Sequence, residues 1–259
     1  MLAALVETDT VWEDPEANRA RVRSSLPRAD VALFPELAFS GFTMEPAPDP
    51  AAEPFLRELA RENSIALVAG YVGEGPTNVA VALDARGEVL ARYAKLHPFT
   101  FAGEEERYRR GDALPLFDLL GFRAAMLICY DLRFPEAFRE AALKGADLFL
   151  VIANWPEKRI AHWTTLLQAR AIENQAYVLG VNRVGSDPNE SYPGRSLAVD
   201  PLGAVLMEGQ GVVELDPERP KWLRSKFPAL RDTRTDRYRL TPSVLSENTA
   251  WIRSGPWTA

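Results

Sequence analysis

Short apolar runs of strand length recur along the chain, separated by segments in which apolar residues follow a helical spacing. We expect strands at residues 2–6, 31–34, 65–71, 78–84, 88–93, 124–128, 147–152, 175–181, 197–199, 204–207 and 211–215. We expect helices at residues 15–26, 55–63, 136–144, 161–174 and 217–226. Asp14 and Pro15 supply a cap and a first-turn proline for the first helix. Residues 43–54, 96–112 and 185–194 are expected to be irregular.

This alternation of strands and helices, with hairpins between them, predicts an α/β fold. The strands could form one mixed sheet or two packed sheets, and the spacing along the chain leaves both arrangements open. The pattern contains no repeat, linker or composition break, so we expect residues 1–259 to be a single domain. From about residue 228 the periodicity is weak, which predicts an extended C-terminal tail.

The apolar run that starts at Ala124 leads into the single cysteine of the chain, Cys129. Pro135 and a helical segment follow it closely. A buried strand that turns into a helix places a side chain beside free backbone N–H groups, which stabilise an oxyanion and favour a thiolate. Cys129 is therefore a candidate nucleophile, although an unpaired cysteine can equally be an inert core residue.

Composition narrows the classes of function. The chain has 259 residues, 47% hydrophobic and 25% charged, which is typical of a globular protein with a sizeable core. Its net charge of -6 gives no reason to expect nucleic acid or an anionic membrane as a partner. One cysteine excludes an intrachain disulfide and favours a cytoplasmic location. We expect no signal peptide, no membrane span, no metal and no organic cofactor.

A cysteine nucleophile needs a proton acceptor and a group that receives the oxyanion. Glu36 and Lys95 each follow a predicted strand, where partial burial and mutual pairing are plausible, although each could also be a surface charge. The rival arrangement pairs Cys129 with a histidine, for which His97 and His162 are the two candidates.

Three blocks of the sequence resemble the signature blocks of the nitrilase superfamily of carbon–nitrogen hydrolases, in the same order and at similar spacing. The blocks are residues 35–37 with 40–42, residues 93–99, and residues 127–136. The likeness extends from the first strand to about Phe227. It implies a four-layer αββα sandwich of two mixed β-sheets flanked by helices, and a homodimer.

The resemblance also implies a Glu–Lys–Cys triad made of Glu36, Lys95 and Cys129. Several members of the family use a further glutamate in a segment that ends in Gly-Asp, and Glu104 occupies the matching place, with Glu105 and Glu106 next to it. The implied reaction needs no cofactor. Glu36 accepts the thiol proton and later activates water, and Lys95 stabilises the oxyanion together with the backbone N–H of Tyr130.

Other segments look most like the omega-amidase branch of this superfamily, whose members hydrolyse 2-oxoglutaramate and 2-oxosuccinamate. These segments are residues 11–14, 151–156, 162–163, 168–177 and 182–185. Such substrates need a cation in the pocket, and the candidates are Arg133, Lys158, Arg159, Arg183 and Arg195. The residues expected to line the pocket are Phe42, Tyr130, Arg133, Asn154 and Trp155.

Two kinds of alternative function remain at this point. The first is another activity of the same superfamily, such as an amidase for deaminated glutathione, a carbamoylase or a nitrilase. The second is a catalytically silent protein that uses the same fold for binding. The presence of all four polar candidates, Glu36, Lys95, Glu104 and Cys129, favours an enzyme.

Overall fold

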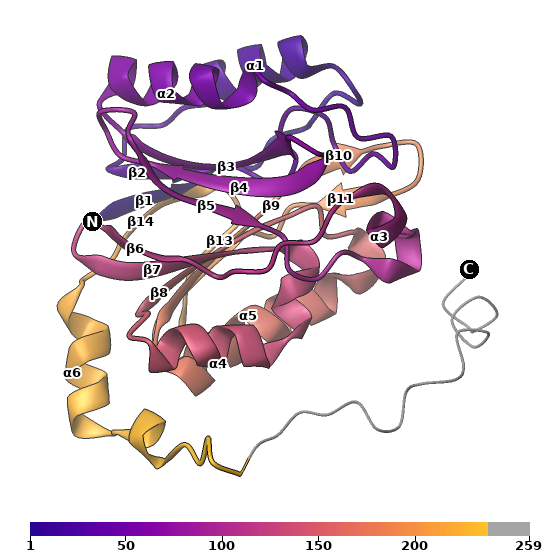
Figure 1. Ribbon diagram of the computed structural model, residues 1–259. Coiled ribbons are helices and arrows are strands. Elements are labelled where there is room, and N and C mark those ends of the chain that lie inside the picture. Colours follow the sequence, from indigo (N-terminus) through magenta and orange to yellow (C-terminus); the bar gives the residue numbers. More distant parts are fainter. Residues whose placement is uncertain (238–259) are drawn as a thin grey trace, which may run out of the picture.

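Two six-stranded sheets pack face to face in the computed structural model, which describes residues 1–237 (Figure 1). The first sheet has the order β14-β1-β2-β3-β4-β5, with β1 at Leu2–Leu5, β2 at Val31–Leu33, β3 at Ala66–Gly73, β4 at Thr77–Leu83, β5 at Val89–Ala94 and β14 at Gly211–Glu214. The second has the order β13-β12-β9-β8-β7-β6, with β6 at Leu116–Leu119, β7 at Phe122–Ile128, β8 at Leu148–Ala153, β9 at Tyr177–Asn182, β12 at Leu197–Val199 and β13 at Val205–Glu208. Both sheets are mixed, because β1–β2–β3 and β7–β8–β9 are parallel and the other pairs are antiparallel.

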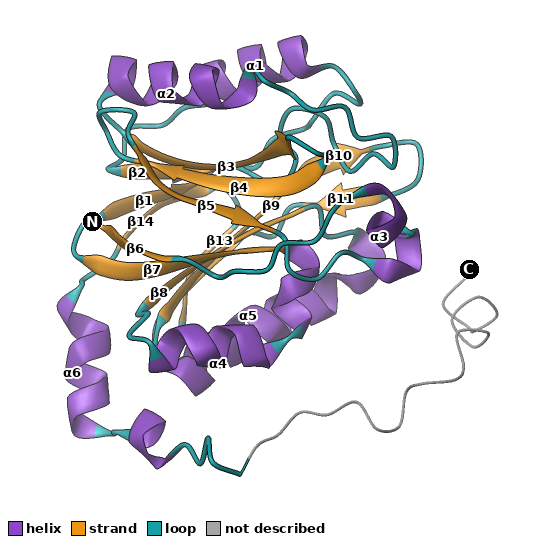
Figure 2. Cartoon of the chain, in the orientation of Figure 1, coloured by secondary structure: helices purple, strands orange, loops and turns teal. Residues whose placement is uncertain are grey.

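Helices cover the outer faces of both sheets (Figure 2). On the first sheet lie α1 (Pro15–Ser24) and α2 (Ala52–Asn63), and on the second lie α4 (Pro135–Leu143) and α5 (Ile160–Asn174). The short α3 (Glu104–Arg107) and α6 (Glu218–Lys226) complete the α-helices of the described residues. The predicted αββα sandwich is confirmed. Within residues 1–237, no helix has both the length and the apolar character that crossing a membrane requires.

The central parallel strands are buried on both faces, which explains why the sequence shows them as continuous apolar runs. Every residue of β3, β8 and β9 is buried. Side chains of the two sheets meet in one cluster, which includes Leu33, Val68, Met126 and Leu150. Each such side chain contributes roughly 1.5–3 kcal/mol on burial, so the sheet-to-sheet contact is the main apolar core.

The structure corrects the prediction for three segments. Residues 96–112 contain α3 and a 3-10 helix at Thr100–Ala102, and β6 was not predicted at all. The expected loop at 185–194 is a hairpin of β10 (Val184–Ser186) and β11 (Ser191–Pro193). Its turn closes because the Asp187 carboxylate accepts the backbone N–H groups of Asn189 and Glu190, at 2.8 and 2.9 Å.

The expected C-terminal tail falls partly within the described residues. Beyond α6, Ala229–Asp232 form a 3-10 helix, so the chain is not extended there. Residues 238–259 lie outside the described residues.

Candidate active site

Four strand ends carry the polar residues of the site. Glu36 follows β2 and Lys95 follows β5 in the first sheet, whereas Cys129 follows β7 and Asn154 follows β8 in the second. Because the two sheets pack face to face, residues far apart in the sequence meet at one end of the sandwich. Asn154 joins the sheets directly, since its backbone N–H donates to Glu36 Oε2 at 2.9 Å and its side chain donates to the Glu36 carbonyl at 2.9 Å.

Glu36, Lys95 and Glu104 form a buried ion cluster. Lys95 Nζ lies 2.8 Å from Glu36 Oε1 and 2.9 Å from Glu104 Oε2, and each of the three side chains is at most 1% exposed. Glu105 and Glu106 are exposed, so the structure brings only Glu104 of the three consecutive glutamates to Lys95. Burying charges is costly unless they are paired and hydrogen-bonded, which these are.

The two carboxylates of the cluster differ in how many donors they bind. Glu104 accepts two bonds from Lys95, one from Asn78 Nδ2 at 3.0 Å and one from the Phe99 N–H at 2.6 Å. Glu36 accepts one bond each from Lys95, Asn78 and the Asn154 N–H. A carboxylate offers about four acceptor positions, so Glu104 is saturated and Glu36 keeps one free for a proton.

Close backbone packing positions Glu36. A Cβ atom at Gly70 on β3 would lie 2.6 Å from the Leu37 nitrogen and 2.7 Å from the Glu36 Cα, which no side chain could tolerate. Leu37 itself has a φ of +46°, an uncommon conformation for a residue with a side chain. The chain therefore turns sharply after β2 and directs the Glu36 carboxylate toward Lys95.

Cys129 occupies a strained turn between β7 and a 3-10 helix at Cys129–Arg133, which separates the strand from α4. Its φ is +46°. The buried Asp131 carboxylate supports this turn, because it accepts the Ile128 N–H at 2.9 Å, the Tyr93 hydroxyl at 2.6 Å and the His97 N–H at 3.0 Å. Asp131 thereby ties the cysteine turn to the segment that carries Lys95.

The surroundings of Cys129 favour the neutral thiol. Burial raises its pKa well above the ordinary value, the negative charge of Glu36 raises the pKa further, and Lys95 offsets only part of this. Burial and the two carboxylates therefore oppose the stabilisation of a thiolate that the helix position and Lys95 provide. A protonated thiol needs a base at the moment of attack.

Lys95 is held in its charged form. Burial by itself lowers the pKa of a lysine, but the carboxylates of Glu104 and Glu36 outweigh burial and raise the pKa of Lys95 well above its usual value. Lys95 Nζ makes three hydrogen bonds, one to Glu36 and one to each oxygen of Glu104, so a developing oxyanion binds Lys95 in place of one of the two Glu104 bonds.

Neither histidine takes part in this constellation. His97 binds Asp131 through Nδ1 at 2.7 Å and stacks on Phe134, with 3.8 Å between ring centroids. His162 contacts Arg133 through Nδ1 at 3.4 Å. Neither histidine lines the cavity in front of Cys129, so the geometry does not support a Cys–His pair.

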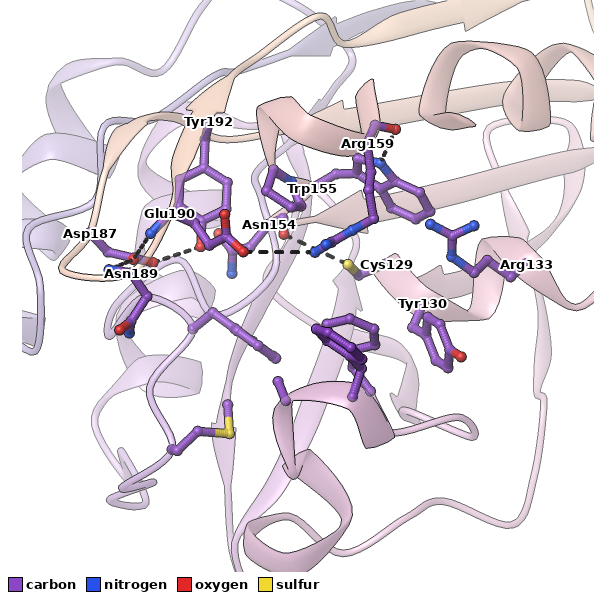
Figure 3. A pocket seen from close by; sticks show the side chains of 16 residues that line it. Cys129, Tyr130, Arg133, Asn154, Trp155, Arg159, Asp187, Asn189, Glu190 and Tyr192 are labelled. Carbon is purple, nitrogen blue, oxygen red and sulfur yellow. Dashed lines mark hydrogen bonds and ion pairs between the residues drawn. The ribbon is translucent and has the colours of Figure 1, made fainter. Parts of the chain in front are cut away.

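A cavity of about 320 Å³ opens in front of Cys129 (Figure 3). All five residues expected to line the pocket do so: Phe42, Tyr130, Arg133, Asn154 and Trp155. The cysteine sulfur lies 3.9 Å from the Asn154 carbonyl oxygen. Phe99 and Tyr192 add further aromatic wall. The volume suits a small substrate.

The five candidate cations lie in different surroundings, and two of them line the cavity. Arg133 and Arg159 line the cavity, whereas Lys158 pairs with Glu190 at 2.6 Å. Arg183 is fully buried under Tyr192, where it donates to backbone carbonyls. Arg195 pairs with Glu208 at 2.6 Å, away from the cavity.

Arg133 alone of the two cavity arginines has no carboxylate within 4.0 Å among residues 1–237. Its guanidinium lies over the Trp155 ring, 4.7 Å from the centroid. Burial lowers its pKa. A half-buried cation without an anionic partner is suited to bind a carboxylate of the substrate.

Sequence reasoning missed Asn78 and Asp131. Asn78 on β4 donates from one nitrogen to both Glu36 and Glu104, and it is 1% exposed. A polar residue inside an otherwise apolar strand was the available signal. Asp131, 0% exposed, gave no signal of its own within the third block. Within residues 1–237, no group of three or more His, Cys, Asp or Glu side chains is placed to hold a metal ion.

Residues 2–214 match the family model for carbon-nitrogen hydrolase. Among curated proteins, the chain is 36% identical to the 2-oxoglutaramate amidase of Bacillus subtilis strain 168, covering 81% of this chain and 87% of that protein. It is 38% identical to an omega-amidase of Yersinia enterocolitica, covering 88% and 95%.

Solved structures of similar proteins have the same architecture. A CN-hydrolase superfamily protein from Xanthomonas campestris, with an arsenic adduct in its active site, aligns with a TM-score of 0.82 and 30% identity over 93% of this chain and 99% of that chain. A glutamate-to-glutamine mutant of the amidase from Nesterenkonia sp. AN1 carries the acetamide moiety of fluoroacetamide on its active-site cysteine. It aligns with a TM-score of 0.81 and 29% identity over 91% and 94%.

Replacing Glu36 with glutamine should lower the pH at which Cys129 ionises, because it removes a negative charge that raises the thiol pKa. Cys129 is the only cysteine, so alkylation by iodoacetamide reports on it alone. In Glu36→Gln the alkylation rate should reach half its maximum at a lower pH than in the unaltered protein. Glu105→Gln, at the exposed neighbour of Glu104, should leave that pH unchanged. An equal or higher midpoint in Glu36→Gln would contradict the assignment.

Proposed function

The chain belongs to the carbon–nitrogen hydrolase family and is an amidase, and we propose that it is an omega-amidase that hydrolyses 2-oxoglutaramate through a thioester on Cys129. The observation that carries this proposal is a small cavity with Cys129 on its wall and with Arg133, which has no carboxylate partner among residues 1–237, backed by the Glu36–Lys95–Glu104 cluster. Relatives named 2-oxoglutaramate amidase and omega-amidase support the choice of substrate.

Acylation begins with the protonated thiol. Cys129 Sγ attacks the amide carbon while the thiol proton passes to the free position of Glu36. The oxygen that gains negative charge binds Lys95, which exchanges one of its two Glu104 bonds for it, and the Tyr130 N–H. Tyr130 lies in the first turn of the 3-10 helix, where a backbone N–H has no partner within the helix. Glu36 then returns the proton to the leaving nitrogen, the C–N bond breaks, and ammonia departs.

Deacylation repeats the same transfers with water. Glu36 accepts a proton from water as its oxygen attacks the thioester carbon, and Lys95 and Tyr130 again stabilise the oxyanion. The C–S bond breaks, and the proton held by Glu36 restores the Cys129 thiol. The products are a carboxylate and ammonia, and neither step requires a cofactor.

Glu104 and Asn78 act as positioning residues in this scheme. Glu104 has no acceptor position left for a proton, so we assign it to holding Lys95 in place. Asn78 bridges the two carboxylates, because its Nδ2 donates to both of them, at 2.8 and 3.0 Å.

For the substrate, we assign Arg133 to the carboxylate of the keto acid. The cavity is lined by aromatic side chains that suit the short carbon chain, and the amide end must reach Cys129. Arg133 is four residues from Cys129 on the same 3-10 helix, so the two groups are held at a fixed separation.

We further propose a cytoplasmic homodimer, in which residues 1–259 form a single domain. Two apolar side chains lie exposed at α5 and the turn that packs against it, with Ile172 54% exposed and Leu202 56% exposed. Ile172 packs against Gly203, which places it next to Leu202. Sedimentation equilibrium should give twice the mass of the chain, and a monomer at micromolar concentration would contradict the dimer.

The function is tested by ammonia release from 2-oxoglutaramate, N-carbamoyl amino acids and simple nitriles. We expect turnover of 2-oxoglutaramate, abolished in Cys129→Ser and Cys129→Ala and reduced by several orders of magnitude in Lys95→Ala and Glu36→Gln, because these groups act together. Glu106→Gln is the matched exposed control. Preference for a carbamoyl compound or a nitrile would contradict the omega-amidase assignment, and retained activity in Cys129→Ser would contradict the thioester.

Replacing Arg133 with glutamine should raise KM for 2-oxoglutaramate roughly ten- to hundredfold, the size of a lost charge-assisted hydrogen bond. A neutral amide such as propionamide makes no such bond, so its kcat/KM should change little. Arg195→Gln, at an arginine outside the cavity, is the control. An equal loss for both substrates would show that Arg133 maintains the structure and does not recognise charge.

A further inference from the structure

We propose that Glu190 sets the charge of the cavity, so that it holds a substrate with one carboxylate and releases a product with two. The inference rests on the proposed function for the identity of the substrate. It concerns a residue that takes no part in bond making or breaking.

Glu190 lies at the turn between β10 and β11 and lines the cavity (Figure 3). Its Oε1 is 2.6 Å from Lys158 Nζ and 3.9 Å from Arg159 Nη2. Its side chain is 26% exposed and that of Arg159 is 18% exposed, so solvent only partly screens the two charges from the cavity. Arg159 in turn lies over the Phe99 ring, 5.3 Å from the centroid.

Four charged residues line the cavity among the described residues: Arg133, Arg159, Asp187 and Glu190. The Asp187 carboxylate is already satisfied. It accepts the Tyr192 hydroxyl at 2.6 Å and two backbone N–H groups, and the buried Arg183 lies 3.9 Å away. The charges on the cavity wall that act on a ligand are therefore those of the two arginines and of Glu190, and the 2.6 Å ion pair with Lys158, which lies outside the lining, offsets part of the Glu190 charge.

Hydrolysis changes the charge of the ligand. The amide end of 2-oxoglutaramate is neutral and the product end is a carboxylate, so a monoanion becomes a dianion in the site. The new carboxylate forms at Cys129, in front of the ion cluster with two carboxylates and one ammonium. A cavity with both arginines unopposed would bind the dianion more tightly than the substrate. Glu190 removes part of that attraction and so favours product release.

The structural role of Glu190 can be separated from its charge. The hairpin is anchored without its carboxylate, because Asp187 closes the turn and Ser191 donates to Glu157 at 2.9 Å. A glutamine at position 190 keeps an oxygen that can accept from Lys158 and removes only the charge. Glu157 is the matched control, since it binds the same hairpin but does not line the cavity.

The test uses two ligands with the same five-carbon chain, 2-oxopentanoate with one carboxylate and 2-oxoglutarate with two. Each ligand protects Cys129 from neutral iodoacetamide, and the concentration that halves the alkylation rate is measured in the unaltered protein, Glu190→Gln and Glu157→Gln. In Glu190→Gln we expect that concentration to fall roughly three- to tenfold for 2-oxopentanoate and roughly ten- to hundredfold for 2-oxoglutarate, from Coulomb repulsion at short range in a partly shielded site. Without ligand, the alkylation rate should stay within about twofold, because the charges that shift the pKa of Cys129 are those of Glu36, Lys95 and Glu104.

Equal shifts for both ligands, or no shift, would overturn the role of Glu190, and so would the same graded shift in Glu157→Gln. Turnover of 2-oxoglutaramate by the unaltered protein is measured separately. Its absence would contradict the proposed function, whereas the protection assay needs no turnover and still decides whether Glu190 discriminates by charge.

Discussion

The buried contact of Lys95 with Glu36 and Glu104 is the interaction on which the rest of the site depends. Three ionised side chains with at most 1% exposure carry one net negative charge, and such a group is stable only when every member is paired and bonded. The amide of Asn78 and backbone N–H groups supply the remaining bonds. Glu104 therefore has no free acceptor position and supports Lys95, whereas Glu36 can still accept a proton.

The packing of the two sheets brings the reactive groups together. Glu36 and Lys95 come from one sheet and Cys129 from the other, so the reactive groups meet only when the two sheets pack in register. Asp131 and Asn154 are the polar links across that junction. Stability and reactivity are coupled here, because burial and the negative charge of Glu36, which also binds Lys95, both raise the pKa of the Cys129 thiol.

Much of the fold and of the candidate site could be predicted from the sequence. The doubly buried strands appear as apolar runs, and the three blocks place Glu36, Lys95 and Cys129. The pairing of sheets came from family likeness, because spacing along the chain carries no information about it. The β10–β11 hairpin and the bridging Asn78 were missed, since both depend on contacts between distant segments. The direction of the Cys129 pKa shift could not be predicted from the sequence, because it depends on burial and on the charges around the sulfur.

The most direct test of the account is intact-mass spectrometry of the protein mixed with 2-oxoglutaramate and quenched early, followed by peptide mapping. The account predicts an added mass equal to the acyl group left after loss of ammonia, located on the peptide that contains Cys129 and absent in Cys129→Ala. Turnover without that adduct under conditions where acylation outpaces hydrolysis, or an adduct on another residue, would contradict it.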